Sequence, residues 1–227
     1  TTASNNTAVG MQSLDANTTG NTNTAIGKDS LGANTTGSQN TGLGHNALES
    51  NTTASDNTAV GKNALRNNTT GTRNTSIGVN SGDAITDGLA NVLVGNNAGG
   101  GGNFTSVVAV GDNALLVNTA NNNTAVGQEA MVANTSGSEN TAVGQGALSS
   151  NTTAIENTAV GRNALTLNTT GAKNTAVGAY SLDANTTGGN NSAFGREALT
   201  KNTSGSQNTG YGLEALKENT TASNNTA

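Results

Sequence analysis

Few side chains in this 227-residue chain could take part in catalysis. His45 is the only histidine, and the chain contains no cysteine. A metal centre or an activated nucleophile needs several such groups close together. We therefore expect no enzyme activity, no catalytic or metal-binding residues and no cofactor, and the composition does not identify a binding residue.

Acidic side chains recur at one position of a repeating pattern and are the remaining candidates for chemistry. Asp29, Glu129, Glu197 and Glu214 share this position. Two carboxylates on one edge of a stacked structure could act as an acid–base pair that cleaves glycosidic bonds. A solvent-exposed edge without a catalytic role explains these carboxylates more simply. A polysaccharide-cleaving enzyme is an alternative, but the sequence does not identify the pair of carboxylates that it would need.

Other motifs exclude further classes of function. The glycine run 99–102 is not followed by Lys and Ser or Thr, so it does not match a phosphate-binding loop. Four aromatic residues are too few for a platform on which sugars or bases stack: Phe104, Tyr180, Phe194 and Tyr211. The net charge of −5 argues against nucleic acid as a partner. No apolar run approaches the roughly 20 residues of a membrane span, so we expect no membrane insertion.

A 17-residue repeat accounts for nearly the whole chain. Its consensus, numbered from 1, is Asn-Thr-Ala-Val-Gly, two variable residues, Ala-Leu, two variable residues, Asn-Thr-Thr-Gly and two variable residues. The invariant glycine at position 5 occurs thirteen times: Gly10, Gly27, Gly44, Gly61, Gly78, Gly95, Gly111, Gly127, Gly144, Gly161, Gly178, Gly195 and Gly212. A short fixed period is typical of a solenoid, in which each repeat buries its apolar side chains against its neighbours.

The residue types within one repeat predict where its side chains point. Position 4 is apolar or aromatic in every repeat, and position 2 is almost always Thr, with Val92 and Val108 as exceptions. This alternation predicts a strand with positions 2 and 4 facing the core. Leu or Met at position 9 predicts a second core site, and Gly at position 5 predicts a turn with positive φ. The Asn-Thr-Thr-Gly segment predicts a second short strand and another turn.

These elements predict an all-β fold, a parallel β-solenoid (β-roll) of about thirteen 17-residue coils. We expect residues 1–227 to form a single repeat domain with irregular coils at about 79–122. The first eight residues recur as the last eight, which predicts a fragment of a longer array. The irregular segment is either a degenerate part of the stack or a binding face, since such faces are often built from irregular coils.

Asparagine recurs at positions 1 and 12, as at Asn6 and Asn17. Stacked Asn side chains can form ladders of amide hydrogen bonds along a solenoid. Position 12 also lies in Asn-x-Thr sequons, which are acceptors for N-glycosylation in secreted proteins. If the position-12 side chains are buried in a ladder, glycosylation there is excluded.

Small residues at positions 3 and 8 predict self-association. Position 8 is always Ala or Ser, and position 3 is usually Ala, Gly or Ser. On a face that pointed to solvent, residue size would not matter, so the small residues favour the close approach of another chain. The alternative is a flattened coil with a narrow interior.

The repeat resembles sequences of two kinds of surface fibre. The segment 123–127, Asn-Thr-Ala-Val-Gly, resembles the Ser-Val-Ala-Ile-Gly strand of trimeric autotransporter adhesin heads, although adhesin-head units are shorter than 17 residues. The longer unit 57–73 is similar to repeats in phage tail fibres and related bacterial surface fibres. The resemblance implies a left-handed β-roll, a homotrimer, and a location at the surface of a cell or virion. We expect these 227 residues to contain no stalk, membrane anchor or C-terminal chaperone domain of the kind found in such proteins.

Together, the repeat and the resemblance predict a non-enzymatic structural segment, the shaft or head of an extracellular fibre or adhesin. The partners expected are further copies of the chain, as a homotrimer or a filament, and a host surface or glycan. One alternative is a subunit of a helical filament whose chains join end to end. Another is an ice- or glycan-binding solenoid that presents Thr columns, with Thr18 and Thr19 as the first candidates.

Overall fold

The computed structural model describes residues 2–227 and shows one three-residue strand in each repeat. Residues 2–227 contain no helix. The strands are β1 Thr7–Val9, β2 Thr24–Ile26, β3 Thr41–Leu43, β4 Thr58–Val60, β5 Thr75–Ile77, β6 Val92–Val94, β7 Val108–Val110, β8 Thr124–Val126, β9 Thr141–Val143, β10 Thr158–Val160, β11 Thr175–Val177, β12 Ser192–Phe194 and β13 Thr209–Tyr211.

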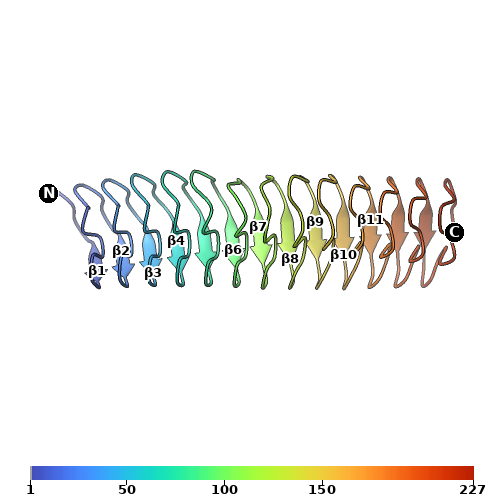
Figure 1. Cartoon of the computed structure of the whole chain (residues 1–227), viewed down its shortest axis with the longest axis horizontal. Helices are drawn as coiled ribbons and strands as arrows, with labels where there is room; N and C mark the ends of the chain where they lie inside the picture. Colours follow the sequence, from blue (N-terminus) through green and yellow to red (C-terminus); the bar gives the residue numbers. More distant parts are fainter. Residues whose placement is uncertain (1) are drawn as a thin grey trace. The chain divides into compact units, whose positions relative to one another are not determined.

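The chain divides into two compact units, Thr1–Val110 and Gly111–Ala227. In each unit, consecutive strands are parallel and every residue pairs with the residue at the same repeat position. Thr141, for example, pairs with Thr124 on one side and Thr158 on the other. Figure 1 shows this arrangement within each unit as a row of short parallel arrows, one per coil. The predicted all-β parallel solenoid is confirmed, while the single domain stays a prediction.

The predicted second strand of each coil is absent from the described residues. The amides of Thr18 and Thr19 both donate to the carbonyl oxygen of Thr35, at 2.9 and 3.2 Å. A bend that aims two successive N–H groups at one carbonyl cannot continue as a strand, because ladder hydrogen bonds are spread evenly along parallel strands.

The side chains of the strands point in the opposite direction from the prediction. In β2, Ala25 at position 3 is fully buried, whereas Thr24 is half-buried and the Ile26 side chain is 37% exposed. Positions 2 and 4 therefore form the outer face of the sheet. The reason is space, because a β-carbon on Gly42, at position 3 of β3, would lie 2.5 Å from Ser30 Oγ. In the regular coils this narrow interior holds Gly, Ala or Ser at position 3, while the larger Val and Ile side chains lie on the outer face.

Position 9 supplies the large side chains of the core, as predicted. Its fully buried members are Leu31, Leu48, Leu65, Leu115, Met131, Leu148, Leu165, Leu182 and Leu199. Position 8 is buried beside them, as at Ala47 and Ala64. Because positions 3 and 8 line the interior of their own coil, the inference that their small side chains approach another chain is wrong.

In the irregular coils of the first unit, the large side chains that fill the interior come from other repeat positions. Leu93 occupies position 3 and is fully buried, while Gly82 and Gly99 replace the usual Leu at position 9. A β-carbon at Gly82 would lie 2.6 Å from Leu93 Cδ1, and one at Gly99 would lie 2.9 Å from Phe104 Cζ. The two glycines therefore make room for Leu93 and Phe104.

In the regular coils, two buried ladders of Asn side chains tie one coil to the next, as predicted. At position 1, Asn40 donates through Nδ2 to Asn23 Oδ1 at 3.2 Å and to the Ala54 carbonyl oxygen at 2.8 Å. At position 12, Asn51 donates to Asn34 Oδ1 at 2.9 Å and to the same Ala54 oxygen at 3.0 Å. The ladders satisfy polar groups that the thin apolar core cannot, and unsatisfied buried groups are costly.

The position-12 ladder stops where Ile85 replaces Asn. Asn68 Oδ1 then lies buried with no hydrogen-bond partner. Most other position-12 Asn side chains are buried, as at Asn51 and Asn168, whereas Asn17 and Asn219 are half-buried. A sequon whose Asn side chain is buried in a ladder cannot carry a glycan in the folded chain.

Positive φ angles are more common than the sequence predicts. The predicted turn glycine is confirmed, with Gly144 at φ 136°. Positions 7 and 9 are also left-handed without Gly, as at Asn163 (φ 55°) and Leu165 (φ 53°). Such a conformation is unfavourable for Leu. It is held here by burial of the side chain and by a hydrogen bond from Leu165 N to the Ser181 oxygen at 3.0 Å.

Candidate functional site

The outer strand face is the most extensive regular surface of each unit, and we define it as the side chains at positions 2 and 4 of the strands. Its position-4 column in the first unit is Val9, Ile26, Leu43, Val60, Ile77, Val94 and Val110; in the second unit it is Val126, Val143, Val160, Val177, Phe194 and Tyr211. All of these are exposed or half-buried, with Leu43 at 42% and Tyr211 at 77%. Continuous exposed apolar surface of this kind marks an interaction site.

Position 2 adds a column of hydroxyl and methyl groups beside the apolar column. It is Thr or Ser in eleven strands and Val at Val92 and Val108. The two columns lie roughly 7 Å apart, because side chains on one face of a strand are two residues apart. Neighbouring strands separate the rows by about 4.8 Å. The face is therefore narrow and strictly periodic.

No charged residue occurs on the outer strand face in any of the thirteen strands described. Charges appear immediately beside it, at position 6, as at Lys62, Asp112 and Arg162. An uncharged apolar stripe beside a column that carries charges resembles a protein interface, in which the centre is depleted of charge and the rim is polar.

The backbone holds this face rigidly. Thr141 N donates to the Asn157 oxygen at 2.8 Å, and Gly144 N donates to the Val126 oxygen at 2.7 Å. Hydrogen bonds of this kind therefore bracket the strand of the coil on both sides. β-branched Thr and Val have few rotamers, so their side chains lose little entropy when they are covered.

Two aromatic rings interrupt the aliphatic column in the second unit. Phe194 in β12 pairs with Tyr211 in β13, and their ring centroids are 5.9 Å apart with planes tilted by 35°. This separation lies in the range for attractive ring pairs. A third ring, Tyr180, lies outside the face, with Arg162 5.7 Å from its centroid.

Of the two Thr columns predicted to bind a ligand, at positions 13 and 14, only one has hydroxyl groups free to do so. Thr18 Oγ1 donates to the Thr35 oxygen at 3.0 Å, and the same bond recurs in most coils. Thr18 and Thr19 are both exposed, but the Thr18 hydroxyl is already hydrogen-bonded within the fold. Only position 14 therefore presents a free column of hydroxyls, and it is interrupted by Asp87 and Ala120.

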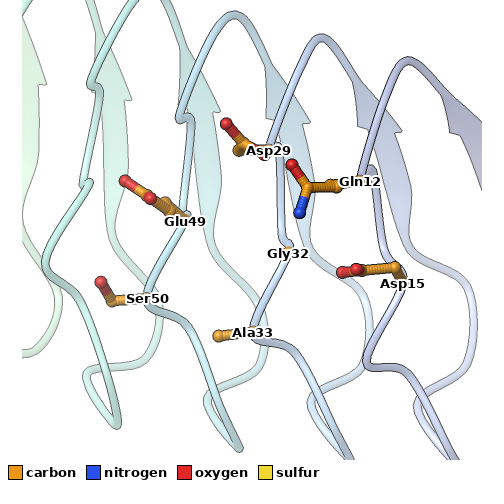
Figure 2. A pocket seen from close by; sticks show the side chains of 7 residues that line it. All are labelled: Gln12, Asp15, Asp29, Gly32, Ala33, Glu49 and Ser50. Carbon is orange, nitrogen blue, oxygen red and sulfur yellow. The ribbon is translucent and has the colours of Figure 1, made fainter.

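The candidate carboxylates do not converge on a catalytic pair that we can identify. Asp29 lines a shallow hollow of about 400 Å³, together with Asp15, Glu49 and four neutral residues, Gln12, Gly32, Ala33 and Ser50. Figure 2 shows these side chains spread over successive coils. Asp29 is paired with Lys28 at 3.0 Å, and Glu49 with Arg66 at 2.8 Å. His45 is exposed at position 6.

Glu197 belongs to an ion-pair network rather than to a site. Lys217 Nζ lies 3.0 Å from Glu197 Oε2, and Arg196 lies 2.6 Å from its other oxygen. The hydrogen bond from Lys217, followed by the nearby positive charges, lowers the pKa of Glu197. Asp83 differs, because partial burial raises the pKa of its carboxyl.

The outer strand face thus consists of the residues at positions 2 and 4, which the sequence pattern had predicted to lie in the core. The sequence contained a signal for the true orientation, since Gly82, Gly99 and Leu93 vary together and imply that position 3 contacts position 9.

Within residues 2–227 we find no cluster of His, Cys, Asp and Glu that could hold a metal ion. In the same residues no helix has the length and apolarity to cross a membrane. The chain matches no protein-family model and no curated protein.

Proposed function

We propose that this chain is a non-enzymatic structural segment, the shaft or head of an extracellular fibre or adhesin at a cell or virion surface. Its role is mechanical, since the coils of each unit are tied to their neighbours by backbone bonds and, in the regular coils, by two Asn ladders. The resemblance to adhesin-head and tail-fibre repeats supports the location. In the fibre, copies pack side by side as a homotrimer.

The observation that carries the proposal is the uncharged apolar outer strand face. In a cyclic assembly the same surface of each copy meets near the axis. A charged residue there would lie close to its own copies, and like charges facing each other are destabilising. The absence of charge from positions 2 and 4 fits a face that meets itself.

The energies require a long contact. Covering a Val or Ile that is already half-buried contributes about 0.5–1 kcal/mol, a fraction of full burial. Association costs about 4–15 kcal/mol in lost freedom of motion. Six coils of the second unit therefore reach only the lower end of this cost, so a few disruptive substitutions should suffice to separate the copies.

Variation at position 4 favours a protein partner over ice. The column contains Val, Ile, Leu, Phe and Tyr. An ice lattice requires a repeated side chain of constant height, whereas packing between chains requires apolar character and tolerates changes in size.

Sedimentation equilibrium at several concentrations tests the proposal. The chain should sediment with three times its mass of 22.2 kDa. Val143→Lys combined with Val160→Lys should convert it to a monomer with an unchanged circular dichroism spectrum. Thr153→Lys combined with Thr170→Lys, which changes exposed residues at position 14, should leave the trimer intact.

The other outcomes are equally informative. A monomeric parent chain contradicts the homotrimer, and thermal hysteresis in a freezing assay would then favour the ice-binding alternative. A mass that grows without limit as concentration rises would favour end-to-end filaments.

A further inference from the structure

The outer strand face is so regular that it does not by itself define how two copies align along the stack. In the second unit, position 4 is Val in four successive strands, at Val126, Val143, Val160 and Val177. A copy displaced by one coil, about 4.8 Å, would meet almost the same side chains. Register is weakly specified wherever neighbouring alignments present equivalent contacts.

Phe194 and Tyr211 break this equivalence. They are the aromatic residues of the position-4 column in the described chain, and they occupy neighbouring strands. Phe194 is 36% exposed and Tyr211 is 77% exposed, so neither residue is fully buried by its own chain. Both rings lie on the outer strand face, in the same column as the four valines and directly after them along the stack.

We propose that Phe194 and Tyr211 set the axial register at which copies of this chain pack along their outer strand faces. The inference rests on the side-by-side packing proposed above and identifies the residues that specify it. In the aligned assembly, the rings of all copies gather at one level, where they can adopt offset or edge-to-face contacts. A shift of one coil places Phe194 of one copy opposite Val177 of another.

The mismatch in a shifted assembly has a physical cost. A ring that faces a Val holds the two backbones further apart than the Val pairs in neighbouring coils allow. The gap that results removes dispersion contacts from the lining side chains. Aliphatic differences elsewhere in the column amount to one or two methylene groups, which packed interfaces accommodate more easily.

Photo-cross-linking measures the register directly. A diazirine analogue of leucine is placed at residue 143, since Leu43 shows that position 4 accepts this size. Chains labelled with ¹⁵N are mixed with unlabelled chains, so that mass spectrometry separates adducts between copies from those within one copy. With both rings present, adducts between copies should map to Thr141–Val143 at least about fivefold more often than to the coil on either side, given the strength of aromatic pairs.

The double variant Phe194→Val, Tyr211→Val should retain the trimer mass but spread the adducts evenly over Thr124–Val126, Thr141–Val143 and Thr158–Val160. The matched control, Tyr180→Asn, removes a ring outside the face, at a left-handed position where Asn also occurs. It should keep the alignment of the parent chain.

Two results separate failure of this inference from failure of the proposed function. If the double variant keeps both its mass and its aligned adducts, the register is set elsewhere and the inference is overturned, while the trimer stands. If the parent chain sediments as a monomer, side-by-side packing fails and the inference fails with it.

Discussion

At the scale of single residues, asparagine takes a role that apolar residues have in most cores. The amides at positions 1 and 12 converge on the carbonyl oxygen at position 15 and also link successive coils. The Gly37 oxygen accepts from Asn23 Nδ2 at 2.8 Å and from Asn34 Nδ2 at 3.0 Å. A coil with one Leu and two Ala side chains inside is stable only if these polar groups are satisfied.

Removing one rung of a ladder should be strongly destabilising. Asn140 donates to the Ala154 oxygen at 2.8 Å and accepts from Asn157 N at 3.0 Å. Asn140→Ala leaves the Asn157 N–H buried without a partner and removes one of the two donors to the Ala154 oxygen, which keeps Asn151 Nδ2 at 3.2 Å. The free energy of unfolding should therefore fall by about 1–3 kcal/mol. Urea denaturation followed by circular dichroism measures the change. Gln145→Ala, at an exposed residue, is the control and should change the free energy by less than about 0.5 kcal/mol; an equal loss in both variants would contradict the role of the ladder.

The charge network around Glu197 predicts a pH effect. Its lowered pKa means that its interactions stabilise the fold above its ordinary pKa of 4.5 and are lost as the pH falls through the lower, folded-state value. Lys217→Gln removes the leading cause of the shift. The Glu197 pKa should then rise towards 4.5, as measured by NMR titration of the side-chain carboxyl. A titration curve unchanged by the substitution would show that Lys217 does not hold this carboxylate in solution.

At the scale of elements, each coil has a fixed interior volume that different positions can fill. In the regular coils, Leu at position 9 lies beside Ala at position 3. In the irregular coils, Leu93 at position 3 lies beside Gly82 and Gly99 at position 9. The exchange explains why the solenoid continues through coils that lack the consensus, and it favours a structural explanation of residues 79–110 over a binding face.

This exchange predicts a coupling between two substitutions. Gly82→Leu alone should clash with Leu93, and Leu93→Ala alone should leave a cavity that costs about 2–5 kcal/mol. The double variant places a Leu at position 9 in space that Leu93 no longer occupies, so it should be more stable than the sum of the single changes by about 1–3 kcal/mol. Denaturation of the four proteins of this cycle gives the coupling energy, and additive effects would contradict the shared volume.

At the scale of the whole molecule, the solenoid is a sum of similar coils and contacts between neighbours. Stability in such proteins grows with the number of repeats, and whole repeats can be lost without change of fold. Proteins of this kind also unfold through partly folded states, so a single unfolding transition is not guaranteed.

Deleting one full period should therefore be tolerated. Removal of residues 141–157 joins Asn140 to Thr158, which is again the step from position 1 to position 2. The shortened chain should keep its β-type circular dichroism per residue, with a denaturant slope reduced roughly in proportion to its length. Removal of nine residues, 141–149, joins Asn140 to Ser150 and should disrupt the coil. If both deletion variants lost their structure, the prediction that a whole repeat can be removed without disrupting the other coils would be wrong.

The sequence alone determined the period, the parallel solenoid, the turn at position 5, the buried site at position 9 and the Asn ladders. These features repeat once per coil, and a regular stack is the arrangement that buries the same position in every coil. The consensus residues of the regular coils could not determine which side of the three-residue strand faces inward. A strand of this length places one residue on one face and two on the other, and Thr and Val suit a buried and an outer position almost equally well.

Only the tertiary structure decided this question, through the width of the coil interior. Leu at position 9 and the two Asn side chains occupy that space, and position 3 of the regular coils holds only Gly, Ala or Ser. The close contact that a β-carbon on Gly42 would make with Ser30 Oγ shows how little room is left. The strand must therefore turn Val and Thr outward. The same packing that corrects the predicted core is what creates the outer strand face.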